Sequence, residues 1–138
     1  MKTYTFEYTE ELQLIVIIAS IDNYDVRLAL DTGASNTVID LTELLIAGYR
    51  KSDAIGQEEY ETGKGNITAD TYRIKKMKVF GIERKNFVIS SYDFLVNNVL
   101  SAIHGVLGLD FFQGRKFCID MDKQEITIHE DTTRQYFN

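Results

Sequence analysis

The chain has 138 residues, of which 21 are acidic and 15 basic, so its formal net charge is −6. That length predicts one domain spanning residues 1–138, and 44% hydrophobic with 26% charged residues excludes a disordered or low-complexity protein. The acidic balance argues against a nucleic-acid-binding protein, and the longest apolar run, Leu14–Ala19, is too short for a membrane-spanning helix. The N-terminus lacks the basic-then-apolar order of a signal peptide, and a single cysteine forms no internal disulfide. We therefore expect a cytoplasmic protein.

The first third of the chain reads as strands joined by tight turns. Gln13–Ile21 is rich in β-branched residues, which favour a strand. Asp22–Tyr24 predicts a turn, because Asp and Asn tolerate left-handed backbone. Asp25–Leu30 then places alternate apolar residues on one face, as a strand does. The pattern predicts a β-hairpin that ends at Asp31, followed by a short strand over Thr37–Ile39.

A short helix is predicted next, over Leu41–Ala47. Asp40 stands at its N-cap position, and Glu43 lies three residues later, where it completes a capping box. Gly48 supplies the residue that ends the helix.

A second hairpin is predicted over Gln57–Ile74, with Gly63-Lys64-Gly65 at its tip. After a turn at Gly81–Glu83, the segment Asn86–Ile89 reads as another strand, and Val106–Gly108 is short and apolar.

The last quarter predicts one or two helical turns and one hairpin. Asp110 is expected to cap the turn that runs through Phe112. Phe117–Met121 and Glu125–His129 read as the two strands of a hairpin, and Cys118, inside an apolar strand, is expected to be a core thiol. Eight or nine short strands and two short helices make the protein mostly β.

The segment with a chemical signature is Leu30-Asp31-Thr32-Gly33-Ala34-Ser35. A carboxylate directly after an apolar strand needs a reason, because burying it unpaired costs several kcal/mol. A turn is one possible reason, since Asp and Gly are common where strands end. Three further features make the pattern more specific: the apolar strand before the motif, Ala34-Ser35 directly after it, and the strand Thr37–Ile39. A second apolar-apolar-Gly segment follows at Val106–Gly108.

These features together resemble the retropepsin-like aspartic proteases, that is, the retroviral proteases and their cellular and bacterial single-domain relatives. That family carries two apolar residues before Asp-Thr/Ser-Gly-Ala/Ser, then a glycine-bearing flap hairpin, then an apolar-apolar-Gly segment leading into a short helix. The corresponding segments here are Ala29–Ala34, the stretch around Gly63-Lys64-Gly65, and Val106–Phe112. The resemblance covers about residues 12–129. It implies the acid protease fold, a closed β-barrel or sandwich with a flap hairpin and one or two short helices, one lobe per chain.

The resemblance implies an aspartic endopeptidase that hydrolyses peptide bonds in peptide or protein substrates. Its chemistry needs two carboxylates that share one proton, so that one acts as base and the other as acid, with no metal and no cofactor. The chain holds a single Asp-Thr-Gly, so we expect the second Asp31 to come from a second copy across a two-fold axis. The protein is therefore expected to act as a homodimer and to be inactive as a monomer.

The resemblance also assigns roles to single residues. Thr32 bonds the partner's backbone, and Gly33 lets the substrate backbone approach. Ala34 lacks the hydroxyl that two-lobed relatives more often carry at this place, so we expect activity at weakly acidic to neutral pH. The catalytic residues are Asp31, Thr32 and Gly33, and the residues expected to contact substrate are Ala34, Ser35, Asn36, Gly63, Lys64, Gly65, Val106 and Leu107.

Two departures from the retroviral pattern occur together. Ser35 and Leu109 stand where retroviral members often carry an Asp and an Arg that pair with each other. Because both partners are replaced, no buried charge is left alone, which favours an alternative packing over a broken enzyme.

Two other functions stay open at this point. One is a catalytically inactive dimer of the same fold that binds peptides, although a pure binding module has no need of paired carboxylates. The other is a small β-domain with an unrelated interaction role. His104 and His129 lack metal-ligand spacing, so no metal site is expected. The terminal segments, Met1–Glu11 and Glu130–Asn138, could form an interchain sheet or cover an edge strand.

Overall fold

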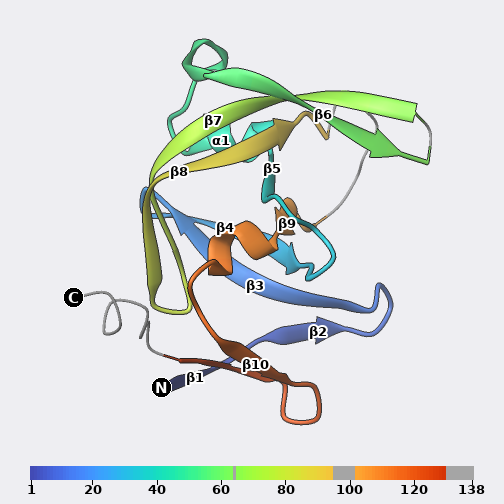
Figure 1. The fold of residues 1–138 in the computed structure, drawn as a ribbon, viewed down its shortest axis with the longest axis vertical. Helices are drawn as coiled ribbons and strands as arrows, with labels where there is room; N and C mark the ends of the chain where they lie inside the picture. The colour runs from blue at the N-terminus through green and yellow to red at the C-terminus, as the bar shows by residue number, and fades with distance from the viewer. Residues whose placement is uncertain (64, 95–101, 130–138) are drawn as a thin grey trace.

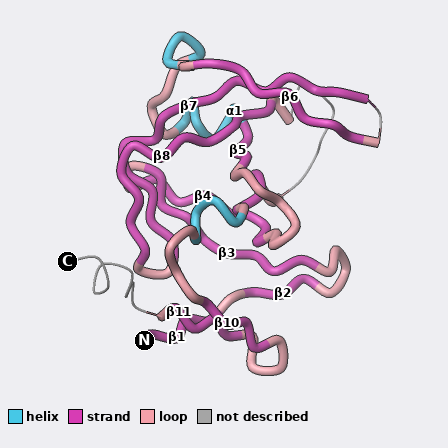
Figure 2. The backbone as a smooth tube through the Cα atoms, viewed as in Figure 1, coloured by secondary structure: helices cyan, strands magenta, loops and turns pink. Residues whose placement is uncertain are grey.

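The computed structural model describes residues 1–63, 65–94 and 102–129 and shows a mostly β protein (Figure 1). The helical segments are one turn or little more, so nearly all of the chain runs in strands and their connecting loops (Figure 2). Along the chain the elements are β1 Lys2–Thr5, β2 Glu7–Thr9, β3 Leu14–Ile21, β4 Tyr24–Leu30, β5 Val38–Asp40, α1 Leu41–Ile46, the 3-10 helix η1 Lys51–Asp53, β6 Gly56–Thr62, β7 Gly65–Val79, β8 Ile82–Tyr92, β9 Gly105–Leu107, the 3-10 helix η2 Leu109–Phe112, β10 Phe117–Asp120 and β11 Glu125–Ile128.

Within the described residues the strands form two sheets. The larger has eight strands in the order β2-β3-β4-β9-β5-β8-β7-β6, and an additional pairing between β3 and β7 closes it on itself. The smaller has three strands in the order β1-β11-β10. The closure gives each strand of the larger sheet an inner face, on which the alternate residues Val26, Leu28 and Leu30 of β4 are buried.

The short strand β9 determines where the ends of β4 and β5 lie. It runs parallel to β4, with Ala29 opposite Val106, and antiparallel to β5, with Ile39 opposite Gly105. A Cβ on Gly105 would lie 2.1 Å from the carbonyl oxygen of Val38, and the residue has φ +144°. Only glycine fits this crossing, so β9 places the carboxyl end of β4 beside the start of β5.

The predicted hairpins are present. Asp22 and Asn23, both with positive φ, form the turn between β3 and β4. β6 pairs with β7 from Gly56 opposite Thr71 to Thr62 opposite Gly65, and β7 pairs with β8 through a turn at Phe80 and Gly81. β10 and β11 form the last hairpin.

The main core is a cluster of apolar side chains from both sheets, from α1 and from η2. β-branched and aromatic residues dominate it, as expected where strands pack face to face. Its members with 0% exposure are Ala19, Ile21, Leu28, Ile39, Leu44, Ile74, Met77, Leu107, Phe111 and Ile126.

Helix α1 is capped by Asp40 as predicted, but Glu43 in its first turn has another role. The Asp40 carboxylate accepts a hydrogen bond from the Thr42 amide at 3.3 Å, and Gly48 follows the helix with φ +107°. The capping box expected from Glu43 is replaced by a tertiary contact, since its carboxylate accepts from the Tyr24 hydroxyl at 2.6 Å. The reason is burial: Glu43 faces the interior, where β4 presents a phenol to it.

Two further expectations about single side chains are wrong. Asp110 does not cap η2, whose N-cap residue is Gly108; its carboxylate bonds Thr37 instead. Cys118 is exposed, because Phe117 and Ile119 turn toward the core and the residue between them faces solvent.

The N-terminal segment forms two strands in the chain's own sheets, which is one of the two roles expected for it. β1 pairs antiparallel with β11, with Lys2 opposite Ile128, and β2 pairs with β3, with Glu7 opposite Val16. The segment therefore covers edge strands of its own chain. The C-terminal segment 130–138 lies outside the described residues. No helix among the described residues is long and apolar enough to span a membrane.

Because of the Tyr49 side chain, the stability of the fold is expected to depend on pH in the alkaline range. Burial, and then its 2.5 Å hydrogen bond to Asp22, raise the pKa of Tyr49 to about 12 from 10.0. Because folding raises this pKa, the neutral Tyr49 hydroxyl stabilises the folded state fully below about pH 10. This contribution is lost as the pH rises toward 12. Urea unfolding is therefore expected to show Tyr49→Phe less stable than wild type near neutral pH, with the difference shrinking above about pH 10. A difference that stays constant across this range would contradict the prediction.

Candidate active site

The Asp-Thr-Gly segment forms a tight loop at the carboxyl end of β4. The Asp31 amide donates to the Leu107 carbonyl at 3.0 Å, which extends the pairing of β4 with β9. The Gly33 amide donates to Asp31 Oδ1 at 2.8 Å, and the Ala34 amide donates to the Asp31 carbonyl at 3.1 Å. The Gly33 bond orients the Asp31 side chain, and the other two hold its backbone. The side chain nevertheless stays exposed to solvent in the single chain.

A buried polar cluster anchors the far end of the same loop. Thr37 is completely buried; its hydroxyl donates to Asp110 at 2.7 Å and accepts from the Gly108 amide at 3.1 Å. The Thr37 amide donates to the other Asp110 oxygen at 3.0 Å. A Cβ on Gly108 would lie 2.7 Å from the Asn36 carbonyl carbon, so the two segments touch backbone to backbone. The loop is therefore held at both ends.

A pocket of about 450 Å³, the Asp31 pocket, opens beside this loop. Asp31 is the only ionisable side chain that lines it among the described residues. Most of the surrounding surface is apolar, since Val16, Ala29 and Ile103 pack together as a small buried cluster with Leu14. The full lining consists of Gln13, Leu14, Ala29, Leu30, Asp31, Thr32, Phe94, Ile103, Gly105 and Val106. A carboxylate thus faces an apolar hollow suited to an uncharged side chain.

The structure brings some of the predicted site residues to this pocket. Asp31, Thr32 and Val106 line it, and Gly33 lies against the carboxylate, where an added Cβ would be 3.1 Å from Oδ1. Leu107 is completely buried in the core, so its side chain is not exposed to a substrate as was expected. The reason is strand alternation: Val106 and Leu107 are neighbours on β9 and face opposite sides.

The other predicted contact residues lie along the loop or on the hairpin. Ser35 and Asn36 are exposed in the loop, and Ala34 is half-buried, with its carbonyl accepting from the Leu109 amide at 2.9 Å. Gly63 and Gly65 lie at the tip of the β6–β7 hairpin and do not line the pocket. Lys64 lies outside the described residues.

The β6–β7 hairpin is tied to the Asp31 loop through β8. It projects toward the same side of the molecule as the loop between β4 and β5 (Figure 1). The Tyr60 hydroxyl on β6 bonds the Ser90 hydroxyl on β8, and the Ser90 amide donates to the Thr37 carbonyl at 3.0 Å. These two bonds therefore link β6, near the tip of the hairpin, to the end of the loop through Ser90.

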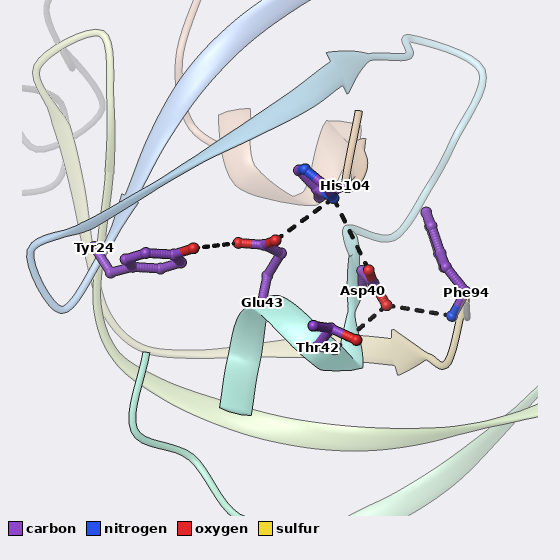
Figure 3. A network of polar contacts seen from close by, with 6 residues as sticks. All are labelled: Tyr24, Asp40, Thr42, Glu43, Phe94 and His104. Atoms are coloured by element: carbon purple, nitrogen blue, oxygen red, sulfur yellow. Dashed lines mark hydrogen bonds and ion pairs between the residues drawn. The ribbon is translucent and has the colours of Figure 1, made fainter. Parts of the chain in front are cut away.

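Sequence reasoning missed a second polar cluster behind the pocket. Tyr24, Asp40, Glu43 and His104 converge there from β4, β5, α1 and the residue preceding β9 (Figure 3). Asp40 and Glu43 were assigned to helix capping, and His104 was considered only as a metal ligand. No local signal joins residues this far apart in the chain. Among the described residues no group of three or more His, Cys, Asp or Glu side chains could hold a metal ion.

Replacing Thr37 with Val is expected to lower the free energy of unfolding by about 2–3 kcal/mol. Valine has nearly the same shape but leaves the buried Gly108 amide without an acceptor and takes one donor from Asp110. Chemical denaturation measures the change. Thr3→Val, which removes an exposed hydroxyl pair with Thr127, is the control and should cost less than about 0.5 kcal/mol. Equal effects of the two substitutions would contradict the assigned role of Thr37.

Comparison with known proteins agrees with this geometry. The model of the aspartyl protease family matches residues 17–111, which includes the Asp31 loop and β9. No curated protein matches the chain in sequence.

Two solved structures share the fold. A retropepsin-like aspartic protease from Rickettsia conorii superimposes with a TM-score of 0.69 at 19% identity, covering 92% of this chain and 89% of that one. The retroviral protease-like domain of Ddi1 from Leishmania major gives a TM-score of 0.56 at 15% identity, covering 85% and 89%. The expected retropepsin-like fold is therefore confirmed, and because the family model spans more than half of the chain, the protein belongs to the aspartyl protease family.

Proposed function

We propose that the protein is an aspartic endopeptidase whose active site forms between two copies of the chain, each contributing Asp31. The observation that carries this proposal is a carboxylate oriented by the Gly33 amide yet exposed at the mouth of an apolar pocket. Asp31 is the only ionisable group lining that pocket among the described residues, and the sequence has no second Asp-Thr-Gly. A second carboxylate must therefore come from another chain, and a two-fold axis supplies the same residue.

Two carboxylates a few ångströms apart share one proton, because both cannot be ionised at once. The ionised one removes a proton from water, and the water oxygen attacks the carbonyl carbon of the peptide bond. The protonated one donates to the carbonyl oxygen as negative charge develops there. The carbon–nitrogen bond then breaks as the nitrogen takes up a proton, which releases a new carboxyl end and a new amino end.

The Asp31 pocket favours a substrate with an apolar side chain next to the cleaved bond. Its surface is built by Leu14, Ala29, Ile103 and Val106, and a desolvated charge on the substrate would find no partner there except Asp31. Gly33 leaves room for an extended peptide backbone to approach the carboxylate.

Cleavage of a diverse peptide mixture across acidic to neutral pH tests the proposal. We expect cuts beside apolar residues, and we expect a statine-type transition-state mimic to block them. Sedimentation should show a dimer wherever activity is found. Full activity from a protein that is monomeric under the assay conditions would refute the two-chain site.

A further inference from the structure

Two residues that line the Asp31 pocket lie close to the two ends of a single segment of the chain. Phe94 precedes residues 95–101 and Ile103 follows them, and both line the pocket. We call these two residues the pocket wall. Ile103 also packs with Val16 and Ala29 in the small apolar cluster, and the Phe94 ring lies edge-on to Tyr92, with 6.2 Å between centroids. The position of this wall determines how large a side chain the pocket accepts.

The carboxylate of Asp40 contacts Phe94 directly and, on its other side, lies beside the neighbour of Ile103. The Phe94 amide donates to Asp40 Oδ1 at 3.2 Å, although Phe94 lies beyond the end of β8. On the other side, Asp40 Oδ2 is 3.9 Å from Nδ1 of His104, the residue next to Ile103 (Figure 3). The Asp40 amide also donates to the His104 carbonyl at 2.9 Å, and the His104 amide donates to the Arg27 carbonyl at 2.8 Å.

The remaining contacts prevent Asp40 and His104 from moving independently. His104 Nδ1 lies 3.6 Å from Glu43 Oε1, and the other Glu43 oxygen accepts from the Tyr24 hydroxyl at 2.6 Å. Asp40 and Glu43 are 6% and 8% exposed, so turning either carboxylate away would leave a buried charge without its partners. This cluster is thus a stiff support behind the pocket.

We propose that Asp40 is a positioning residue that sets the size selectivity of the Asp31 pocket by holding Phe94 and Ile103 in place, with His104 as its second contact. This inference rests on the proposed function only for the identity of the occupant, an apolar side chain of a peptide. Asp40 does not touch that occupant itself, since it does not line the pocket.

The substitution Asp40→Ser separates this role from helix capping. Serine caps a helix about as well as Asp, so the start of α1 is retained. Its side chain is too short to reach the Phe94 amide and the His104 ring. Asp40→Asn keeps an oxygen for the Thr42 and Phe94 amides and serves as the conservative rescue. Tyr49→Phe is the matched control, because it removes hydrogen bonds to Asp22 and Lys75 at a residue that does not line the pocket.

Amide hydrogen exchange is the first readout, and it needs no catalysis. In wild type, the Phe94 amide is expected to exchange slowly despite lying outside a strand. Asp40→Ser should speed its exchange at least about tenfold, and Asp40→Asn and Tyr49→Phe should not. Fast exchange at Phe94 in the wild-type protein would overturn the proposal whether or not the variants fold.

Binding of uncleavable reduced-amide peptides is the second readout. Three peptides that differ only in one apolar residue, Ala, Leu or Phe, are titrated while the Ile103 methyl resonance is followed. Asp40→Ser is expected to reduce the ratio of Kd values between the best and worst peptide at least about threefold, and Asp40→Asn to restore most of it. An unchanged ratio in Asp40→Ser would overturn the proposal. Failure of wild type to cleave any peptide would instead count against the proposed function, since neither readout depends on cleavage.

Discussion

Replacing Asp31 with Asn is expected to lower kcat/KM for peptide cleavage at least about 10³-fold. The amide has nearly the same shape and still accepts a hydrogen bond from the Gly33 amide, so the loop keeps its conformation. It can neither remove a proton from water nor share one with a second carboxylate. Asp122→Asn, which makes the same charge change in an exposed turn, is the control and should leave the rate unchanged.

Mixing this variant with wild type tests whether the site needs two chains. If each active site takes one Asp31 from each copy, a dimer with one Asn is inactive. After equimolar mixing and exchange of subunits, activity should fall to about one quarter of that of the same total amount of wild-type protein. A value near one half would show that each chain acts alone and would contradict the proposed function.

Replacing Gly105 with Ala is expected to lower the free energy of unfolding by about 4 kcal/mol or more. The new Cβ would lie 2.1 Å from the Val38 carbonyl oxygen and 3.0 Å from Ile39 Cα, both backbone atoms that cannot turn aside. Relieving the overlap requires β9 to separate from β5, and this also removes support from the Asp31 loop. Thermal and chemical unfolding measure the loss, and we expect activity to be lost with it.

Gly114→Ala is the matched control for this substitution. Gly114 also has positive φ, +80°, but no atom lies within 4 Å of the position that an added Cβ would occupy. Only backbone strain remains there, so the expected cost is about 1 kcal/mol. If the two substitutions lower the free energy of unfolding by the same amount, the close approach of β9 to β5 is not the reason for glycine at position 105.

The local elements of this fold could be predicted because their signals lie close together in the chain. β-branched residues in β3, the Asp22-Asn23 turn, and the glycines of the β6–β7 tip each act through their own backbone and near neighbours. The capping of α1 by Asp40 is likewise a contact over two residues. The terminal strand β1 escaped prediction because its polar residues become a strand only by pairing with β11 at the other end of the chain.

Single side chains with more than one possible partner were predicted poorly. Asp110 and Glu43 both fit a helix cap by their position in the sequence, yet Asp110 bonds Thr37 in the Asp31 loop and Glu43 bonds Tyr24 on β4. A buried carboxylate is stabilised most by the donors that surround it, and those donors are chosen by packing. Leu107 and Cys118 show the same limit for strands, since the face that each occupies depends on the register of pairing.

The sequence by itself determined the mostly β class, the order of the hairpins, and the Asp-Thr-Gly motif at the end of an apolar strand, all of which are local patterns. Only the tertiary structure decided that β9 lies between β4 and β5, that Thr37 and Asp110 tie the loop across 73 positions, and that Asp40 supports the pocket from behind. The physical reason is that these contacts arise when the closed sheet brings distant segments to one place, where burial leaves each polar group few partners.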